Sequence, residues 1–493
     1  MITKRFLLFP FLLIFISCEG QKQDSFGTYE AESGEYRNMI LLPDQEASGG
    51  KYLSIQQNSE VIWDIPLEHS GYYQIVIRYR TRGGDQMQYL VKNGKEIGIG
   101  FDMSDDWNLC SQPFYLDSGV NTLGLRDGWG SMDLDWISLE RAITDFSITP
   151  KKNIYYLTQG RDLVFKIDNF NQQVKQCMLN GGEVEFYQQS YPYQEYSSWL
   201  TIPSGAFTGL KTGECDLEVN LESEKMNAII DIRKEPDEAG LIIVAPDVGH
   251  GSAMLLRLPG GTNMLIDCGT SGARDSILVP MLKRIGVDTI QTFILTHYHQ
   301  DHDGGDSGKV ILEDFHVQTF IDYRTYPTGY QWEQDGVSFK VLNSYDDGEE
   351  ENTRSLSLMI RYNGFRLVHG GDTYGVNQRM ILKRFPEDVP ADVFYANHHF
   401  HGSVYPEYIL STDPDLVILQ AQEAIYARAA YMVKYKKECE QVLNRRRHDP
   451  VETLPALEVG TIVLRINGGK DWSYETYRDQ NDAIIKMPQP IVR

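Results

Sequence analysis

The chain has 493 residues, too many for a single hydrophobic core, so its length predicts two to four domains. It carries 69 acidic against 46 basic side chains, a formal net charge of −23, and such a surface repels the phosphate backbone, which excludes broad nucleic-acid binding. A local positive site made by bound metal ions stays compatible with an anionic substrate.

Residues 1–17 have the pattern of an export signal. Lys4 and Arg5 precede an apolar run, residues 6–16, that is too short to cross a bilayer as a stable helix. The run ends at Cys18 and resembles a bacterial lipoprotein signal, which implies a lipid anchor on Cys18 and an outer-membrane or cell-surface location. The alternative is a secretory signal with an incidental cysteine. Both interpretations predict an exported protein.

Residues 25–141 and 142–235 are both predicted to be β-structure. In the first segment, short alternating runs such as residues 72–79 are separated by glycine-rich turns, and no helical period of useful length occurs. The second continues in the same style, with strands expected at 217–221 and 228–232. We expect a second, immunoglobulin-like β-sandwich there.

The pattern changes after a charged linker, and residues 239–480 are predicted to form an α/β layered domain. A buried-type strand at 241–245 is followed by a helical pattern at 276–285 and a continuous apolar strand at 290–295. Strands mixed with helices favour layers whose site lies at the strand ends.

Four residues of metal-ligand type follow the 290–295 strand directly: His297, His299, Asp301 and His302. A strand that ends in a loop can direct His297 and His299 to one ion while Asp301 and His302 turn toward a second. The alternative, a histidine-rich surface loop, is disfavoured by the strongly apolar strand before it.

This segment resembles the metallo-β-lactamase superfamily signature His-x-His-x-Asp-His. The resemblance implies an αββα fold and a hydrolase with two divalent ions, zinc first and manganese or iron as alternatives. Residues 247–253 and 265–269 are similar to the opening of the subgroup related to the β-lactamase-like domain of ComEC, a DNA-uptake channel protein. In this superfamily an Asp after a later strand bridges both metals, which implies that role for Asp372; an ordinary turn aspartate is the alternative.

The subgroup's His-His-Gly-Ser motif corresponds here to residues 398–403, with two extra residues inside it. We predict His398 as a ligand of the second metal because it stands at the strand end, and His401 as a group that protonates the leaving group or holds substrate. Asn352 stands where the superfamily usually has a third His for the first metal, so that metal lacks one nitrogen donor. We expect Asn352 to donate a hydrogen bond to substrate instead, and Asp301 to orient the nucleophile.

The first β-segment resembles carbohydrate-binding modules of families 6 and 35, which are jelly-roll β-sandwiches. The resemblance covers residues 29–140 and implies a structural calcium held by Glu30, Glu32 and Asp135. The alternative is that Glu30 and Glu32 alternate on an exposed strand face. Trp107 and Trp129 are the candidate sugar-binding aromatics, although an aromatic in a β-sandwich is more often part of the core.

Together the resemblances predict an exported metal-dependent hydrolase that a glycan-binding module holds on a cell-envelope polymer. A phosphodiester in a phosphorylated glycan or teichoic-type polymer is the bond we expect. One alternative is an ester, lactone or amide hydrolase of the same fold. The other is a noncatalytic glycan-binding lipoprotein.

Overall fold

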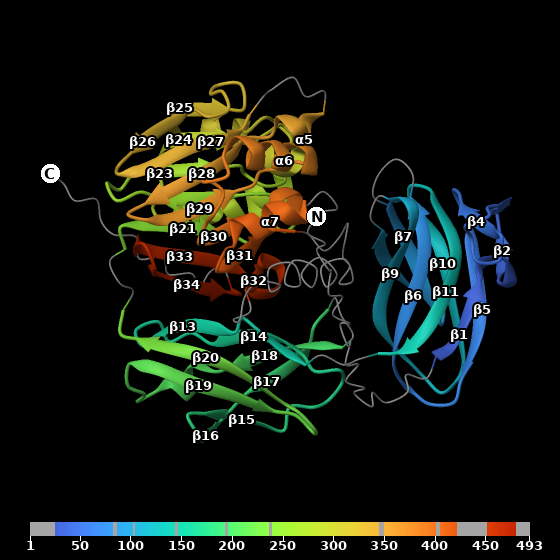
Figure 1. The fold of residues 1–493 in the computed structure, drawn as a ribbon. Coiled ribbons are helices and arrows are strands. Elements are labelled where there is room, and N and C mark those ends of the chain that lie inside the picture. The colour runs from blue at the N-terminus through green and yellow to red at the C-terminus, as the bar shows by residue number, and fades with distance from the viewer. Residues whose placement is uncertain are drawn as a thin grey trace, which may run out of the picture.

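The computed structural model describes residues 25–81, 86–101, 104–142, 146–192, 196–235, 239–344, 350–400, 405–421 and 451–479 (Figure 1). Cys18 and His401 lie outside these ranges, so the predictions made for them stay predictions. Within the described ranges no helix has the length and apolar character needed to cross a membrane.

The N-terminal part is a β-sandwich of two antiparallel sheets, blue to cyan in Figure 1. One sheet has the order β3 (Ile40–Pro43), β4 (Lys51–Ile55), β11 (Met132–Arg141), β6 (Gly71–Thr81) and β9 (Ser104–Leu116), and β1 (Ser25–Glu30) pairs with β11. The other has the order β2 (Glu35–Arg37), β5 (Glu60–Leu67), β10 (Gly119–Trp129), β7 (Gln86–Lys92) and β8 (Lys95–Phe101). Side chains that alternate inward, such as Trp63, Ile75 and Leu125, fill the core between them.

A second β-sandwich follows. Its first sheet has the order β12 (Ser147–Thr149), β14 (Leu163–Asp168), β18 (Ser197–Ile202) and β17 (Tyr187–Ser190). Its second sheet has the order β13 (Lys152–Tyr156), β20 (Lys225–Arg233), β19 (Gly213–Asn220), β15 (Gln176–Leu179) and β16 (Gly182–Val184). Phe165 and Leu200 of the first sheet share a core with Leu217 and Ile230 of the second. Figure 1 shows this sandwich beneath the last domain, against its β33–β34 side.

The C-terminal domain has two sheets face to face. The first has the order β25 (His316–Asp322), β24 (Thr289–Leu295), β23 (Asn263–Ile266), β22 (Met254–Arg257), β21 (Leu241–Ala245), β33 (Thr461–Gly468), β34 (Asp471–Tyr477). The second has the order β26 (Gln331–Gln334), β27 (Val337–Asn343), β28 (Ser357–Tyr362), β29 (Phe365–His369), β30 (Val393–Tyr395), β31 (Leu416–Leu419), β32 (Glu452–Pro455).

Helices cover the outer face of each sheet. Phe293 packs outward in a core with α2 (Val279–Arg284) and α4 (Lys309–Asp314), while its neighbour Ile294 points into the core between the sheets. The second half of β24 is therefore buried on both faces, which is why residues 293–295 are all apolar. Helices α6 (Gly375–Arg384) and α7 (Pro406–Thr412) cover the second sheet. The predicted series of two β-sandwiches and an αββα domain is confirmed.

Candidate metal centre

The predicted metal ligands come from strand ends at one edge of the αββα domain. His297 and His299 follow β24, and Asp301 and His302 lie in the short helix α3 (Gln300–Asp303) that begins directly after them. Asp372 follows β29. Since β29 is parallel to β30, the segments after these two strands leave the sheet at the same edge.

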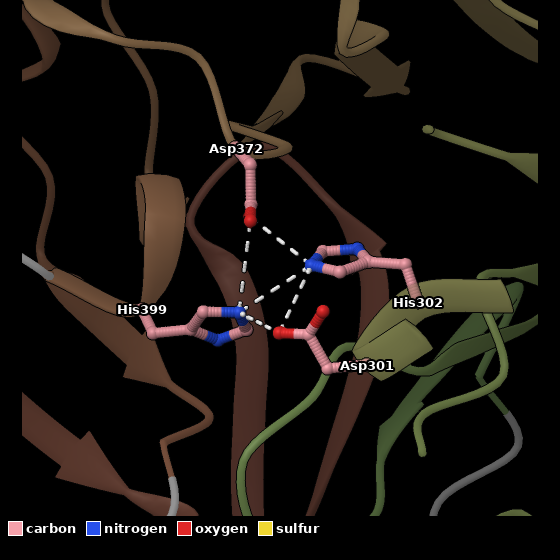
Figure 2. Close-up of side chains that lie close together, drawn as sticks. All are labelled: Asp301, His302, Asp372 and His399. Carbon is pink, nitrogen blue, oxygen red and sulfur yellow. Dashed lines mark hydrogen bonds and ion pairs between the residues drawn. The ribbon is translucent and has the colours of Figure 1, made fainter. Parts of the chain in front are cut away.

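Asp301, His302, Asp372 and His399 converge on one point (Figure 2). One ligand atom from each lies within 4.8 Å of all the others. His302 Nε2 is 3.2 Å from Asp372 Oδ1, and His399 Nε2 is 3.2 Å from Asp301 Oδ2. The two imidazole nitrogens themselves are 3.3 Å apart.

His297, His299 and Asp372 form a second such group beside the first. His297 Nε2 lies 3.1 Å from His299 Nδ1 and 3.5 Å from Asp372 Oδ2. Asp372 therefore belongs to both groups. A carboxylate shared by two sets of imidazole ligands is an arrangement suited to two neighbouring cations.

The chemistry of these donors fits divalent metal ions. Burial and the neighbouring His302 lower the pKa of His297 well below its ordinary value, which keeps this imidazole neutral, as a metal ligand has to be. Burial also lowers the pKa of His302, but Asp372, Asp267 and Asp301 outweigh burial and raise it well above its ordinary value. The centre thus carries an excess of carboxylate charge, which divalent cations would neutralise, and nitrogen and oxygen donors together suit zinc, manganese or iron.

Asp267 contacts the His302 ring at Nδ1, on the side that faces away from the centre. It is fully buried, accepts hydrogen bonds from the backbone and hydroxyl of Thr296 at 2.7 and 2.8 Å, and lies 2.8 Å from His302 Nδ1. A carboxylate on one ring nitrogen fixes the orientation of the ring and leaves Nε2 to face the centre. Asp267 therefore supports the ligand His302 and belongs to neither ligand group itself.

Comparison with known proteins agrees with this geometry. Residues 246–403 match the family model for the metallo-beta-lactamase superfamily, and residues 28–142 match the model for carbohydrate binding module family 35. The chain joins a metallo-β-lactamase domain to a family 35 carbohydrate-binding module. Both predicted resemblances are confirmed.

Two curated relatives match the metallo-β-lactamase part. Competence protein ComA of Neisseria gonorrhoeae is 28% identical over 230 residues, which are 45% of this chain and 32% of the relative. ComE operon protein 3 of Bacillus subtilis (strain 168) is 23% identical over 264 residues, 44% of this chain and 32% of the relative. The chain thus spans about a third of the length of these relatives.

Solved structures match the N-terminal part. A family 35 module from Clostridium thermocellum is 19% identical, with a TM-score of 0.22, and the match covers 24% of this chain and 98% of that one. A Podospora anserina GH26-CBM35 β-(1,4)-mannanase is 21% identical, with a TM-score of 0.23, over 30% of this chain and 32% of that one.

In the metallo-β-lactamase domain His399, and not the predicted His398, completes the group with Asp301, His302 and Asp372. Residues 398, 399 and 400 all have left-handed backbone angles, with φ of 44°, 52° and 60°. The chain therefore turns sharply after β30, and the residue closest to the strand end is not the one that points into the group. His398 Nε2 lies on the edge of the centre, 4.0 Å from Asp372 Oδ2.

Asn352 is buried next to His398 on the same edge. Its Nδ2 donates to the Tyr374 hydroxyl at 3.0 Å and lies 3.3 Å from His398 Nε2. Its Oδ1 is buried and accepts no hydrogen bond from the described residues. The atom of the Asn352 side chain without a hydrogen bond is therefore its carbonyl oxygen, which accepts. We had predicted that Asn352 donates a hydrogen bond to substrate.

The calcium ligands predicted for the family 35 module are only partly assembled. The Oε2 atoms of Glu30 and Glu32 are buried without a hydrogen bond, and a Cβ on Gly49 would lie 2.5 Å from Glu32 Oε1 and 3.6 Å from Glu30 Oε2. These two carboxylates therefore face one small space beside Gly49 and do not alternate on an exposed strand. Asp135 instead accepts from Ser48 N at 3.0 Å and forms an ion pair with Arg78. Calcium binding here stays a prediction.

The two candidate sugar-binding tryptophans differ in their surroundings. Trp107 is partly buried, with the Arg80 guanidinium 4.4 Å from its ring and Tyr52 packed edge-on at 5.6 Å. Trp129 stands at the end of β10 with 62% of its surface exposed. Trp129 is therefore the residue of the two that a ligand can reach without rearrangement.

Sequence reasoning missed His250. This residue lies in the loop after β21, and its Nε2 is 3.4 Å from Asp301 Oδ2. The glycines on either side of it, Gly249 and Gly251, are a signal that could have drawn attention to it, because glycines at a strand end indicate close approach of the backbone to another group.

Proposed function

We propose that this protein is an exported, lipid-anchored hydrolase that cleaves phosphodiester bonds in a phosphorylated surface or extracellular polymer, held there by its family 35 module. The observation that carries the proposal is Asp372, whose carboxylate lies within 3.8 Å of imidazole nitrogens from both ligand groups. Zinc is the expected metal, with manganese or iron as alternatives.

The residues of the centre divide the work. His297 and His299 would hold one cation and Asp301, His302 and His399 the other, with Asp372 between them. Cations bound there supply Lewis acidity for hydrolysis at neutral pH. Asp301 is 21% exposed, and His299 is exposed as well, so substrate approaches the centre from their side. From that side Asp301 is placed to orient an attacking water.

An exposed arginine after strand β25, Arg324, is the residue that we propose meets an anionic substrate. Arg324 donates from Nη2 to the Tyr298 hydroxyl at 2.5 Å, and Tyr298 stands between the ligands His297 and His299 in the chain. The Arg324 side chain is 60% exposed while Asp322 holds its inner edge. A guanidinium fixed in this way binds phosphate more readily than a mobile lysine, because less side-chain freedom is lost on binding.

A panel of chromogenic substrates tests the bond that is cleaved. Purified protein is assayed with zinc, manganese or iron on phosphodiesters, phosphomonoesters, phosphorylcholine esters and carboxylic esters. We expect a clear preference for phosphodiesters, which Asp372→Asn abolishes. A preference for carboxylic esters would instead support the ester, lactone or amide hydrolase, and a protein without stoichiometric metal would support the noncatalytic lipoprotein.

Glycan binding and anchoring need separate tests. Retention on insoluble and gel-embedded polysaccharides should fall more for Trp129→Ala than for Trp107→Ala, because Trp129 is the exposed ring. The calcium prediction is tested by chelation, which should lower the melting temperature of the module. Cys18→Ser should abolish metabolic labelling with a fatty acid and release the protein from the membrane fraction. Labelling that persists in this variant would contradict the anchor.

A further inference from the structure

The β21–β22 loop, residues 246–253, packs directly against Asp301 of the second ligand group. Ser252 N donates to the Asp301 carbonyl oxygen at 3.0 Å. At Gly251 an added Cβ would lie 2.6 Å from that same oxygen, so only glycine permits the backbone to come this close. The loop therefore fixes the main chain of Asp301.

The same loop also fixes His399, through Gln420. His399 Nδ1 lies 2.7 Å from the Gln420 carbonyl oxygen, and since a carbonyl can only accept, this nitrogen carries the proton and Nε2 faces the centre. The Gln420 side chain accepts from Ala253 N at 2.9 Å and donates to Ala253 O at 3.0 Å. One loop thus reaches two ligands that are far apart in the sequence.

His250 projects from this loop between those two ligands. Its Nε2 lies 3.4 Å from Asp301 Oδ2, and its ring centroid lies 4.5 Å from that of His399. The side chain is only 11% exposed. His250 is not part of the four-residue ligand group, so it contacts the ligands from outside.

The imidazoles around Asp301 are not equivalent. Asp301 Oδ2 lies 3.2 Å from His399 Nε2 and 4.0 Å from His302 Nε2. Once these two nitrogens give their lone pairs to a cation, neither can donate a hydrogen bond to Asp301. His250 stands outside the group, and its Nε2 lies 3.4 Å from Oδ2 of this carboxylate.

We propose that His250 is a positioning residue for the second cation, holding the Asp301 carboxylate and the His399 ring in the orientation that metal binding needs. This inference rests on the two-cation centre of the proposed function. Residues that orient metal ligands in this way typically contribute about 10- to 100-fold to metal affinity.

The test compares His250→Ala with His250→Gln in the full chain. Glutamine keeps an N–H donor of similar reach, whereas alanine removes both the donor and the ring. Cation stoichiometry is measured by elemental analysis, site affinities by chelator competition, and the ligand geometry by the absorption spectrum of the cobalt-loaded protein. His316→Ala, on the exposed part of edge strand β25, is the matched control.

We expect His250→Ala to weaken one of the two sites about 10- to 100-fold and to change the cobalt spectrum, with the other site unaffected. His250→Gln should bind both cations within about threefold of wild type, well inside the range expected for a lost orienting residue. The inference is overturned if alanine changes neither affinity, or if glutamine is as defective as alanine. A wild-type chain that binds a single cation overturns the two-cation centre, and this inference with it.

Discussion

Two buried polar clusters lie in the metallo-β-lactamase domain, and they differ in how their charges are paired. In the metal centre, imidazole nitrogens face each other at 3.1 and 3.3 Å. At the contact with the second β-sandwich, Glu475 accepts from the Tyr156 hydroxyl at 2.5 Å and from the Arg465 guanidinium. The Glu475 and Arg465 side chains are 0% and 3% exposed.

The difference shows which cluster is complete in the protein alone. Around Glu475 three groups donate to the one carboxylate: the Tyr156 and Tyr477 hydroxyls and Nε of Arg465. Arg161 adds a hydrogen bond to Thr476 O at 2.9 Å and packs on the Tyr477 ring. Such a closed network fixes the second sandwich on β34. In the metal centre imidazole nitrogens instead lie close to one another and to the carboxylates of Asp301 and Asp372, an arrangement that bound cations would complete. One cluster therefore holds domains together, whereas the other is built to bind ions.

The largest effect is expected when Asp372, the residue shared by both ligand groups of the metal centre, is changed. Asp372→Asn should lower hydrolysis more than about 100-fold, beyond what the loss of an orienting residue costs, because both cations lose a charged ligand. Rates and metal content are measured together. Asp314→Asn, which removes a surface partner of Lys283, is the control and should match wild type. Full activity with full metal content in Asp372→Asn would contradict the assignment.

In the network around Glu475 we expect a substitution to lower the stability of the protein without lowering its hydrolytic activity. Glu475→Gln leaves Arg465 buried without a counter-charge, which should cost about 3 to 5 kcal/mol in the free energy of unfolding. Metal content and the rate per folded molecule should stay unchanged. Lys152→Ala on β13 breaks only an exposed pair with Glu214 and should cost about 0 to 1 kcal/mol. Denaturant unfolding of both variants separates the two cases; equal costs would mean that the cluster around Glu475 does not hold the sandwich.

Asp267→Asn tests whether the metal centre depends on the contact between Asp267 and His302. Asp267 has a left-handed backbone with φ of 56°, which asparagine tolerates well, so the variant removes charge without adding strain. We expect the affinity for one cation to fall about 10- to 100-fold, because the orientation of His302 depends on this carboxylate. Chelator competition measures the change, and unaltered affinity at both sites would show that His302 needs no such support.

The two clusters also mark where sequence reasoning succeeded and where it failed. His297, His299, Asp301 and His302 were found because they lie within six residues after an apolar strand, a local pattern. The contact of Tyr156 with Glu475 joins residues 319 positions apart, and no local pattern announces it. Alternation and strand length predicted β-domains followed by an α/β layered domain, and the family resemblances implied the jelly-roll and αββα folds. Neither predicted how the domains dock.

The choice between the histidines after β30 could not be predicted for a different reason. A strand pattern predicts where the strand ends but not the backbone angles that follow, and left-handed angles at three consecutive non-glycine residues are uncommon. His398 and His399 are therefore equivalent in sequence and distinct in space. Only the tertiary structure shows which of them joins the candidate ligand group.

The smallest effect we predict concerns acid stability, at Lys166. This buried lysine lies 2.9 Å from Asp168 and 3.2 Å from Glu458, so it joins the second sandwich to the metallo-β-lactamase domain. Burial raises the pKa of Asp168, but Lys166 and hydrogen bonds from Ser197 and Ser147 outweigh burial and hold it below its ordinary value. A carboxyl whose pKa is lower in the folded state stabilises the protein above its unfolded pKa of about 3.9, and this contribution is lost as pH falls through the folded value.

Asp168→Asn should therefore be less stable than wild type at pH 7, by about 1 kcal/mol, the usual net value of a hydrogen bond. The difference in unfolding free energy between wild type and Asp168→Asn should begin to narrow below about pH 4, near the unfolded pKa of an aspartate. It should vanish at lower pH, because wild-type Asp168 is then protonated and no longer pairs with Lys166. Urea unfolding between pH 7 and pH 3 measures it, with Glu214→Gln on the exposed surface as the control. If the difference in unfolding free energy stays constant over this range, Asp168 acts through its shape rather than its charge, and its contact with Lys166 would then owe its stability to packing.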